Sequence, residues 1–231
     1  MTPPPAIPIP AKSFKVVIQC AGNKDPDAGS LHCKDGREVV FVAHPELAPQ
    51  DGQYYARPDD QSDDGRTWRA RLEEYNQGHV NNPLHLLPAY KLYWHHAYRD
   101  LVTEYGADRV FILSAGWGLI SANYLTPDYD ITFSANADPY IRRGNQDKKY
   151  QDFNQLPDSD EPLVFLGGAS YQQFFLRLTA GYRGTRIVCY NSGKPPQVDG
   201  CMLCRYETRT RTNWHYQCAM DLIAGRLHLP L

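Results

Sequence analysis

The sequence predicts an α/β protein with a mostly parallel central sheet, helices on both faces, and a C-terminal extension rich in cysteine and arginine. Short apolar runs alternate with segments of helical periodicity, which is the pattern of a parallel sheet covered on both faces. Three of the predicted strands end in small or polar residues. Because ligands of such sheets bind beyond the carboxyl ends of the strands, these three ends are expected to lie at one functional edge.

Each predicted element follows from its own local pattern. The apolar runs that predict strands cover residues 14–20, 38–43, 110–113, 162–166 and 186–190. Apolar residues at helical spacing predict helices over 67–77, from Pro83 to Gly106, over 171–179 and from 212 onwards. Residues 45–66 are polar and rich in aspartate, so we expect a mobile surface loop there.

Length and composition indicate one α/β domain over residues 14–231, preceded by a proline-rich lead over 1–13. That lead has neither a basic segment nor a continuous apolar segment, so it does not resemble a signal peptide. No apolar run approaches the ~20 residues that span a bilayer. We therefore expect a cytoplasmic protein without a membrane partner, whose six cysteines are thiols or metal ligands. The net charge of −2 means that a nucleic-acid partner must meet a local basic face.

The strand at 110–113 is followed by Ser114, a further alanine and the triplet Gly116, Trp117 and Gly118. Glycines after a strand allow another backbone or a ligand to approach closely. One interpretation is that they free Trp117 to project as a platform on which a base stacks. The alternative is a tight turn in which Trp117 covers the core.

An acidic motif follows the Gly-Trp-Gly triplet after a short loop. Asp128 and Asp130 flank Tyr129, so both carboxylates point the same way if the segment is extended. A carboxylate in a pocket can orient water or support positive charge developing on a sugar ring. Solvated loop aspartates are the alternative interpretation.

Two further strand ends carry candidate ligand-binding groups. Asn23 and Lys24 follow the first strand and could hold a phosphate or a base edge, or form a surface turn. Gly167 and Gly168 precede the helix that begins at Tyr171, where free backbone N–H groups could meet an anion. Small residues at a helix start also serve capping alone.

The C-terminal segment contains a candidate metal site and a candidate phosphate site. Cysteines and a histidine in a C-x2-C-x10-H-x2-C arrangement suggest a structural zinc site, with buried thiols as the alternative; the ligands would be Cys201, Cys204, His215 and Cys218. Arginines alternate with threonines just before the aromatic start of the last helix, which suits contact with phosphates. The predicted phosphate contacts are Arg142, Arg143, Arg205, Arg209 and Arg211, with a solvated strand face as the alternative for the last three.

The order of these motifs resembles the bacterial domains related to the peroxide-stress protein YaaA. The resemblance rests on Val-Val-Ile-Gln-Cys-Ala-Gly-Asn-Lys, on Ile-Leu-Ser-Ala-Gly-Trp-Gly-Leu with the later Pro-Asp-Tyr-Asp, and on Val-Phe-Leu-Gly-Gly before a tyrosine. It covers about residues 14–185. Trp117 stands where that family usually has Tyr or His, and the segment from 191 lies outside the shared core.

This resemblance implies a DNA-binding α/β domain, some of whose relatives are similar in layout to uracil-DNA-glycosylase-type enzymes. Related proteins in phage defence are thought to cut modified bases from phage DNA. The site that the motifs imply consists of Cys20, Asn23, Lys24, Ser114, Gly118, Asp128, Tyr129 and Asp130.

We therefore expect a DNA N-glycosylase that excises a modified base from phage DNA and leaves an abasic site in antiviral defence, without a required cofactor. Asp128 or Asp130 would position water and stabilise the sugar cation, and Asn23 and His215 would read or protonate the base. Substrate contacts would come from Cys20, Lys24, Ser114, Trp117, Gly118, Tyr129, Gly168, Tyr171 and Trp214. The alternatives are a DNA-binding stress protein without catalysis and an N-glycoside hydrolase of free nucleosides or nucleotides.

Overall fold

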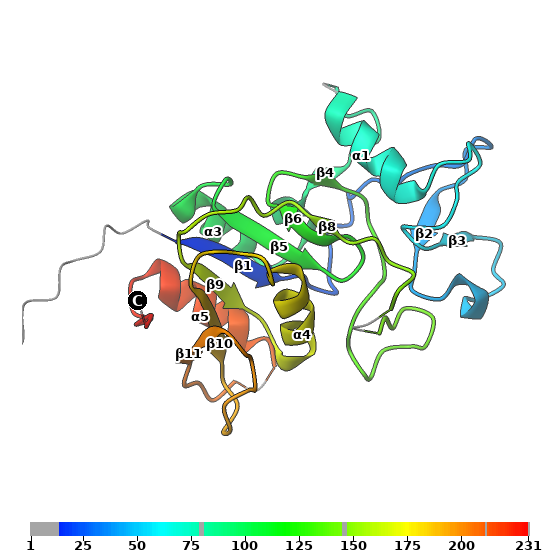
Figure 1. Ribbon diagram of the computed structural model, residues 1–231. Coiled ribbons are helices and arrows are strands. Elements are labelled where there is room, and N and C mark those ends of the chain that lie inside the picture. The colour runs from blue at the N-terminus through cyan, green and yellow to red at the C-terminus, as the bar shows by residue number, and fades with distance from the viewer. Residues whose placement is uncertain (1–13, 79–80, 145–146, 211, 231) are drawn as a thin grey trace, which may run out of the picture.

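The computed structural model describes residues 14–78, 81–144, 147–210 and 212–230. Its centre is a seven-stranded sheet in the order β11-β10-β9-β1-β5-β6-β8 (Figure 1). The strands are β1 (Lys15–Gln19), β5 (Val110–Ser114), β6 (Gly118–Ser121), β8 (Phe153–Asn154), β9 (Leu163–Leu166), β10 (Arg186–Tyr190) and β11 (Cys201–Arg205). Every pair in this sheet is parallel except β5 with β6. The predicted mostly parallel α/β fold is thus confirmed.

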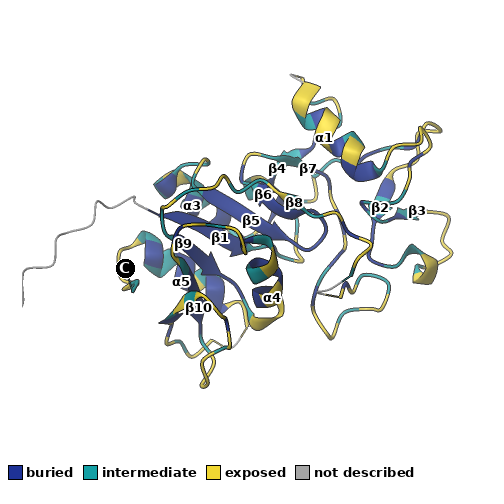
Figure 2. Cartoon of the chain, in the orientation of Figure 1, coloured by how far each residue is buried: buried dark blue, intermediate teal, exposed yellow. Residues whose placement is uncertain are grey.

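Helices cover both faces of the sheet (Figure 1). Helix α3 (Ala97–Tyr105) packs beside α5 (Trp214–Ile223), and these two contact β5 and β9 respectively. Helix α4 (Ala169–Leu178) lies on the opposite side of the sheet (Figure 1). The central strands are apolar and buried between these layers (Figure 2), which explains why they read as continuous apolar runs.

The direction of winding reverses at β1. From β1 the chain moves to β5 on one side, whereas β9, on the other side, leads outwards to β10 and β11. A ligand crevice in a doubly wound sheet forms where neighbouring connections leave in opposite directions. The carboxyl ends of β1 and β9 form such a point in this sheet.

A smaller unit lies beside the sheet and contains a two-stranded parallel sheet. It comprises β2 (Val39–Phe41), β3 (Tyr54–Ala56), the short 3-10 helix η1 (Pro45–Leu47) and α1 (Trp68–Gly78). Figure 2 shows α1 with one buried and one exposed face.

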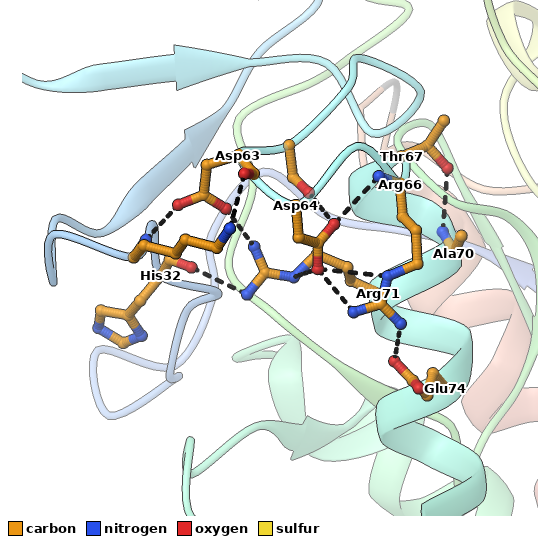
Figure 3. Close-up of polar contacts among 10 residues, drawn as sticks. His32, Asp63, Asp64, Arg66, Thr67, Ala70, Arg71 and Glu74 are labelled. Atoms are coloured by element: carbon orange, nitrogen blue, oxygen red, sulfur yellow. Dashed lines mark hydrogen bonds and ion pairs between the residues drawn. The ribbon is translucent and has the colours of Figure 1, made fainter.

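The aspartate-rich segment of this unit is held by many polar contacts. Arg71 bonds to the carboxylate of Asp63 at 3.2 Å and to the carbonyl of His32 at 3.1 Å (Figure 3). Arg66 joins Asp64 to Glu74 (Figure 3). The segment that the sequence predicts as a mobile loop thus contains β3 and a network of ion pairs anchored on α1.

The long helix predicted between Pro83 and Gly106 is wrong, because this stretch is divided. It forms β4 (Leu87–Pro88), α2 (Ala89–Leu92) and α3, and β4 pairs with β7 (Leu125–Thr126). Between α2 and α3, Tyr93 forms an antiparallel bridge with Lys24. The backbone of this break is thus bonded to the loop after β1 rather than to a helical turn. No helix within the described residues is long and apolar enough to cross a membrane.

Candidate functional site

A cavity of about 380 Å³ lies at the point where the winding reverses. Its walls come from the end of β1 and the loop after it, the first turn of α4, the break between α2 and α3, the segment 132–134 and the start of α5. The lining residues are Gln19, Cys20, Ala21, Gly22, Asn23, Trp94, His95, Thr132, Ser134, Ser170, Tyr171, Asn213 and Tyr216. None of these described lining residues is Lys, Arg, Asp or Glu, so hydroxyl, amide, thiol and aromatic groups form the cavity surface.

The loop after β1 holds the break between the helices in place. The amide N–H of Asp25 donates to the carbonyl of Leu92 at 2.8 Å, and that of Trp94 donates to the carbonyl of Asn23 at 3.2 Å. These bonds replace the helical bonds that the break loses. They leave the Trp94 residue 61% exposed while it lines the cavity, which is unusual for so large an aromatic residue.

An aromatic wall continues from this break to α5. The ring of His95 stacks on that of Tyr216 with centroids 3.8 Å apart and planes 8° apart. The hydroxyl of Tyr216 lies 3.3 Å from that of Tyr98, and the Tyr98 hydroxyl donates to the carbonyl of Gln19 at 2.8 Å. This wall therefore ties the C-terminal helix to the end of β1.

A buried network of hydroxyl and thiol groups lies next to the cavity. The Cys20 thiol and the Tyr171 hydroxyl are 3.2 Å apart. The Tyr129 hydroxyl lies 2.9 Å from both the Tyr93 hydroxyl and the Ser114 Oγ. Burial raises the pKa of Tyr93, Tyr129 and Tyr171 well above the usual value, so these tyrosines stay protonated at neutral pH.

The acidic motif lies in an adjoining hollow of about 260 Å³. Asp128, Tyr129 and Asp130 line it together with residues of β2. The Asp128 carboxylate is 56% exposed and lies 3.6 Å from Lys24 Nζ, which sits over the Tyr129 ring at 4.4 Å. Partial burial raises the pKa of Asp130, the Lys24 charge opposes this shift, and the Asp128 carboxylate adds to it. Asp128 and Asp130 therefore stand close to Lys24, but outside the larger cavity.

The prediction that Trp117 projects as a stacking platform is wrong. Trp117 is completely buried, and its ring meets Phe41 edge-on with centroids 5.1 Å apart. Its amide N–H donates to Ser114 Oγ at 3.1 Å, and its carbonyl accepts from Arg69 at 2.8 Å. Gly118, with φ of +100°, packs so closely on Phe153 that a Cβ there would lie 2.4 Å from the Phe153 carbonyl oxygen. Ser114, Trp117 and Gly118 therefore form core structure, and none of them lines the cavity.

The five arginines predicted to contact phosphate have different surroundings. Arg143 is buried, pairs with Asp152 at 2.7 Å and donates to the carbonyl of Ala115 at 2.6 Å, so the prediction that it grips phosphate is wrong. Arg142, Arg205 and Arg209 are exposed. Arg142 pairs through its backbone with Thr132, a cavity residue. Arg211 lies outside the described residues.

The predicted zinc ligands are not arranged as a metal site. Cys201 and Cys204 are three positions apart on one strand, so their side chains point to opposite faces of the sheet. Among the residues that the structure describes, no group of three or more His, Cys, Asp or Glu could hold a metal ion. Cys204 is instead buried opposite Cys189 of β10, in agreement with the alternative of buried thiols.

His215 and Trp214 are buried at the start of α5, and neither lines the cavity. Burial lowers the pKa of His215 to about 4, and the nearby His95 adds to this shift. Its role as a group that reads or protonates a base is therefore not supported by its position. Of the other predicted site residues, Asn23 and the substrate contacts Cys20 and Tyr171 line the cavity, while Gly168 caps α4 beside it.

Sequence reasoning missed Trp94 and His95, which lie inside the predicted long helix. Their signal is the run Tyr-Trp-His-His over 93–96, which places large polar aromatics on every face of a helix instead of on one. Comparison with protein-family models, with curated proteins and with solved structures finds no match. The resemblance to the YaaA-related domains therefore stays a prediction that rests on the motifs.

Proposed function

We propose that the protein is a DNA N-glycosylase that binds a modified base, such as one in phage DNA, in the cavity between the end of β1 and the start of α4. The observation that carries this proposal is the cavity itself, with the exposed Trp94 on its lining. A volume of about 380 Å³ lies in the ~300–1,000 Å³ range of small-molecule sites. The exposed ring of Trp94 provides a face on which a base stacks, whatever its sequence context.

The proposed reaction breaks the bond between the base nitrogen and C1′ and adds water at C1′. Asn23 lines the cavity and would orient the attacking water or the base edge with its amide. Lys24 is the next residue and contacts Asp128 in the adjoining hollow. A sugar held over this loop would have the base on its cavity side and the carboxylates of Asp128 and Asp130 on the other. Those carboxylates would then stabilise the positive charge of the sugar.

Exposed arginines next to the cavity walls support DNA as the substrate. Arg142 adjoins the wall at Thr132, and Arg209 lines a surface hollow with Gln217 of α5, the helix that supplies Tyr216 to the cavity. Two such cations could contact the phosphates that flank a flipped nucleotide. All six cysteines lie in the described part and are free, which fits a reducing compartment such as the cytoplasm.

The test incubates the protein with hypermodified phage DNA and with unmodified DNA, followed by mass spectrometry for free base and an assay for abasic sites. Free base and abasic sites are expected from the modified DNA alone. Asn23→Ala should reduce release by about 100-fold or more, the scale of a lost transition-state contact. Asn123→Ala, a change at an exposed residue outside the cavity, is the matched control and should release base at the normal rate.

A second candidate is an N-glycoside hydrolase of free nucleosides or nucleotides. It is favoured by the absence of Lys and Arg among the described residues that line the cavity, because a small ligand needs no row of phosphate contacts. Replacing Arg142 and Arg209 together by Gln distinguishes the two. If DNA is the substrate, the substitutions should lower the activity on DNA and make that activity less dependent on salt concentration. If free nucleosides are the substrate, the substitutions should leave their hydrolysis unchanged. DNA binding without any base release would indicate the non-catalytic alternative.

A further inference from the structure

Two side chains in the cavity wall have their acceptor atoms occupied by backbone amides. The N–H of Gly168, at the start of α4, donates to Gln19 Oε1 at 2.6 Å. The N–H of Ala97, at the start of α3, donates to His95 Nδ1 at 3.1 Å. Both Gln19 and His95 line the cavity.

These two bonds fix which hydrogen-bonding groups remain for a ligand. A backbone N–H can only donate, so the Gln19 atom that it meets must be the carbonyl oxygen, and the amide's NH2 group is left over. By the same reasoning, Nδ1 of a neutral His95 carries the lone pair and Nε2 carries the proton. Within the described part of the chain, neither the Gln19 amide nitrogen nor His95 Nε2 has a hydrogen-bond partner.

The neutral form of His95 is also the favoured one. Burial lowers the pKa of His95 and the adjacent His96 lowers it further, against an opposing effect of Asp100. Protonation at Nδ1 would in addition break the bond from the Ala97 N–H. The ring therefore presents a single N–H donor at neutral pH, held in place by its stack on Tyr216.

We infer that Gln19 and His95 are fixed hydrogen-bond donors in the cavity wall. They select a base that directs carbonyl oxygens or ring nitrogens, and not amino groups, towards this wall. This inference rests on the proposed function, and it names the class of base that the cavity accepts. The other polar lining side chains, such as Asn23 and Ser170, can present either a donor or an acceptor. An amino group facing the two fixed donors would leave polar groups unpaired, and such sites discriminate strongly.

Two substitutions reverse or remove one donor each while keeping its backbone bond. Gln19→Glu has nearly the same shape, still accepts from the Gly168 N–H, and presents an acceptor where the NH2 stood. His95→Asn retains an acceptor for the Ala97 N–H, since an Asn side chain accepts from the backbone N–H two residues on, and its shorter side chain leaves no donor at the position of Nε2. Gln155→Glu is the matched control, because Gln155 Oε1 likewise accepts from a backbone N–H, that of Ser121 at 2.9 Å, outside the cavity.

The experiment measures binding by fluorescence anisotropy to labelled single-stranded oligonucleotides that differ only in the central nucleotide, which is thymine, cytosine or abasic. The wild type and Gln155→Glu should bind the thymine oligonucleotide about tenfold or more tightly than the cytosine one. Gln19→Glu should abolish or invert this preference, and His95→Asn should reduce it. The inference is overturned if the wild type prefers cytosine or shows no preference, or if Gln19→Glu and His95→Asn both keep the wild-type preference.

The outcome is separable from that of the proposed function. Base preference that responds to these substitutions, together with no base release from any DNA, would reject the glycosylase and retain the donor assignment. If no oligonucleotide binds, the same comparison is made with thymidine and cytidine by calorimetry, where equal affinities would reject the donor assignment. Thermal unfolding of each variant identifies any that fails to fold, in which case the other variant decides.

Discussion

The turn after β5 and the loop after β1 follow neighbouring strands of one sheet, yet the turn is filled with protein and the loop lines a cavity. At the turn, carbonyl groups of residues 115–117 accept bonds from Arg69 and Arg143, and Trp117 occupies the interior. At the cavity, Trp94 is exposed, and none of the described lining residues is an arginine or a lysine. The same end of a parallel sheet thus holds a packed core on one side and an open cavity on the other.

The glycines at these two places have different surroundings. A Cβ at Gly116 would lie 3.0 Å from the ring of Tyr129, and one at Gly118 would lie 2.4 Å from the Phe153 carbonyl oxygen. A Cβ at Gly22, which lines the cavity, would meet nothing within 4 Å. The glycines of the Gly-Trp-Gly motif therefore allow close approach by the protein itself, whereas Gly22 borders open space in the cavity.

The largest expected effect concerns the packed turn after β5. Arg143→Met should lower the free energy of unfolding by about 3–5 kcal/mol, because it leaves the almost fully buried Asp152 carboxylate without its main partner. Only Arg177, which is partly exposed, would still pair with that carboxylate. Urea denaturation measures the change. Arg142→Met alters the adjacent exposed arginine and should cost less than about 0.5 kcal/mol; equal losses for the two would refute the filled turn.

Trp117 and Trp94 should respond differently to the same substitution. Trp117→Ala should destabilise by about 3–5 kcal/mol, because it removes a fully buried ring from the core. Trp94→Ala should cost less than about 1 kcal/mol and should instead weaken DNA binding, because this ring is exposed at the cavity. Denaturation and a binding titration of both variants provide the measurement. Reversed effects would exchange the roles assigned to the two residues.

A smaller effect concerns acid stability at the start of α5. His215 has a pKa of about 4 when folded, so the unfolded chain binds its proton more readily. Stability is then complete above about pH 6.5 and falls by up to about 3 kcal/mol as the pH decreases towards 4. His215→Gln should flatten this part of the profile, and His228→Gln, at an exposed position, should leave it unchanged. An unaltered profile in the first variant would assign the acid sensitivity to other groups.

The fold was predictable because the strands are short apolar runs of a kind that only a buried sheet produces, and β1, β5, β9 and β10 lie close to the predicted ranges. The site was predictable in part. Cys20, Asn23 and Tyr171 follow from the rule that ligands bind at strand ends, and they do line the cavity. Trp117 did not follow, since a tryptophan between glycines has the same sequence signal whether it projects or packs.

The break that exposes Trp94 was not predictable from periodicity. Residues 84–106 have apolar positions at helical spacing, and the break depends on backbone bonds to the loop after β1, more than sixty residues away in sequence. The buried partner of Arg143 was missed for the same reason, because a basic pair in an irregular segment carries no sign of the enclosed Asp152. Tertiary contacts decide both features.

The most direct test of the open cavity uses the accessibility of Trp94. Trp68, Trp117 and Trp214 are buried, so Trp94 should account for most of the tryptophan fluorescence that acrylamide quenches. Saturating single-stranded DNA should reduce this quenching in the wild type, and Trp94→Phe should remove the reduction. If bound DNA leaves the quenching of Trp94 unchanged, or if the protection persists in Trp94→Phe, the base does not enter this cavity.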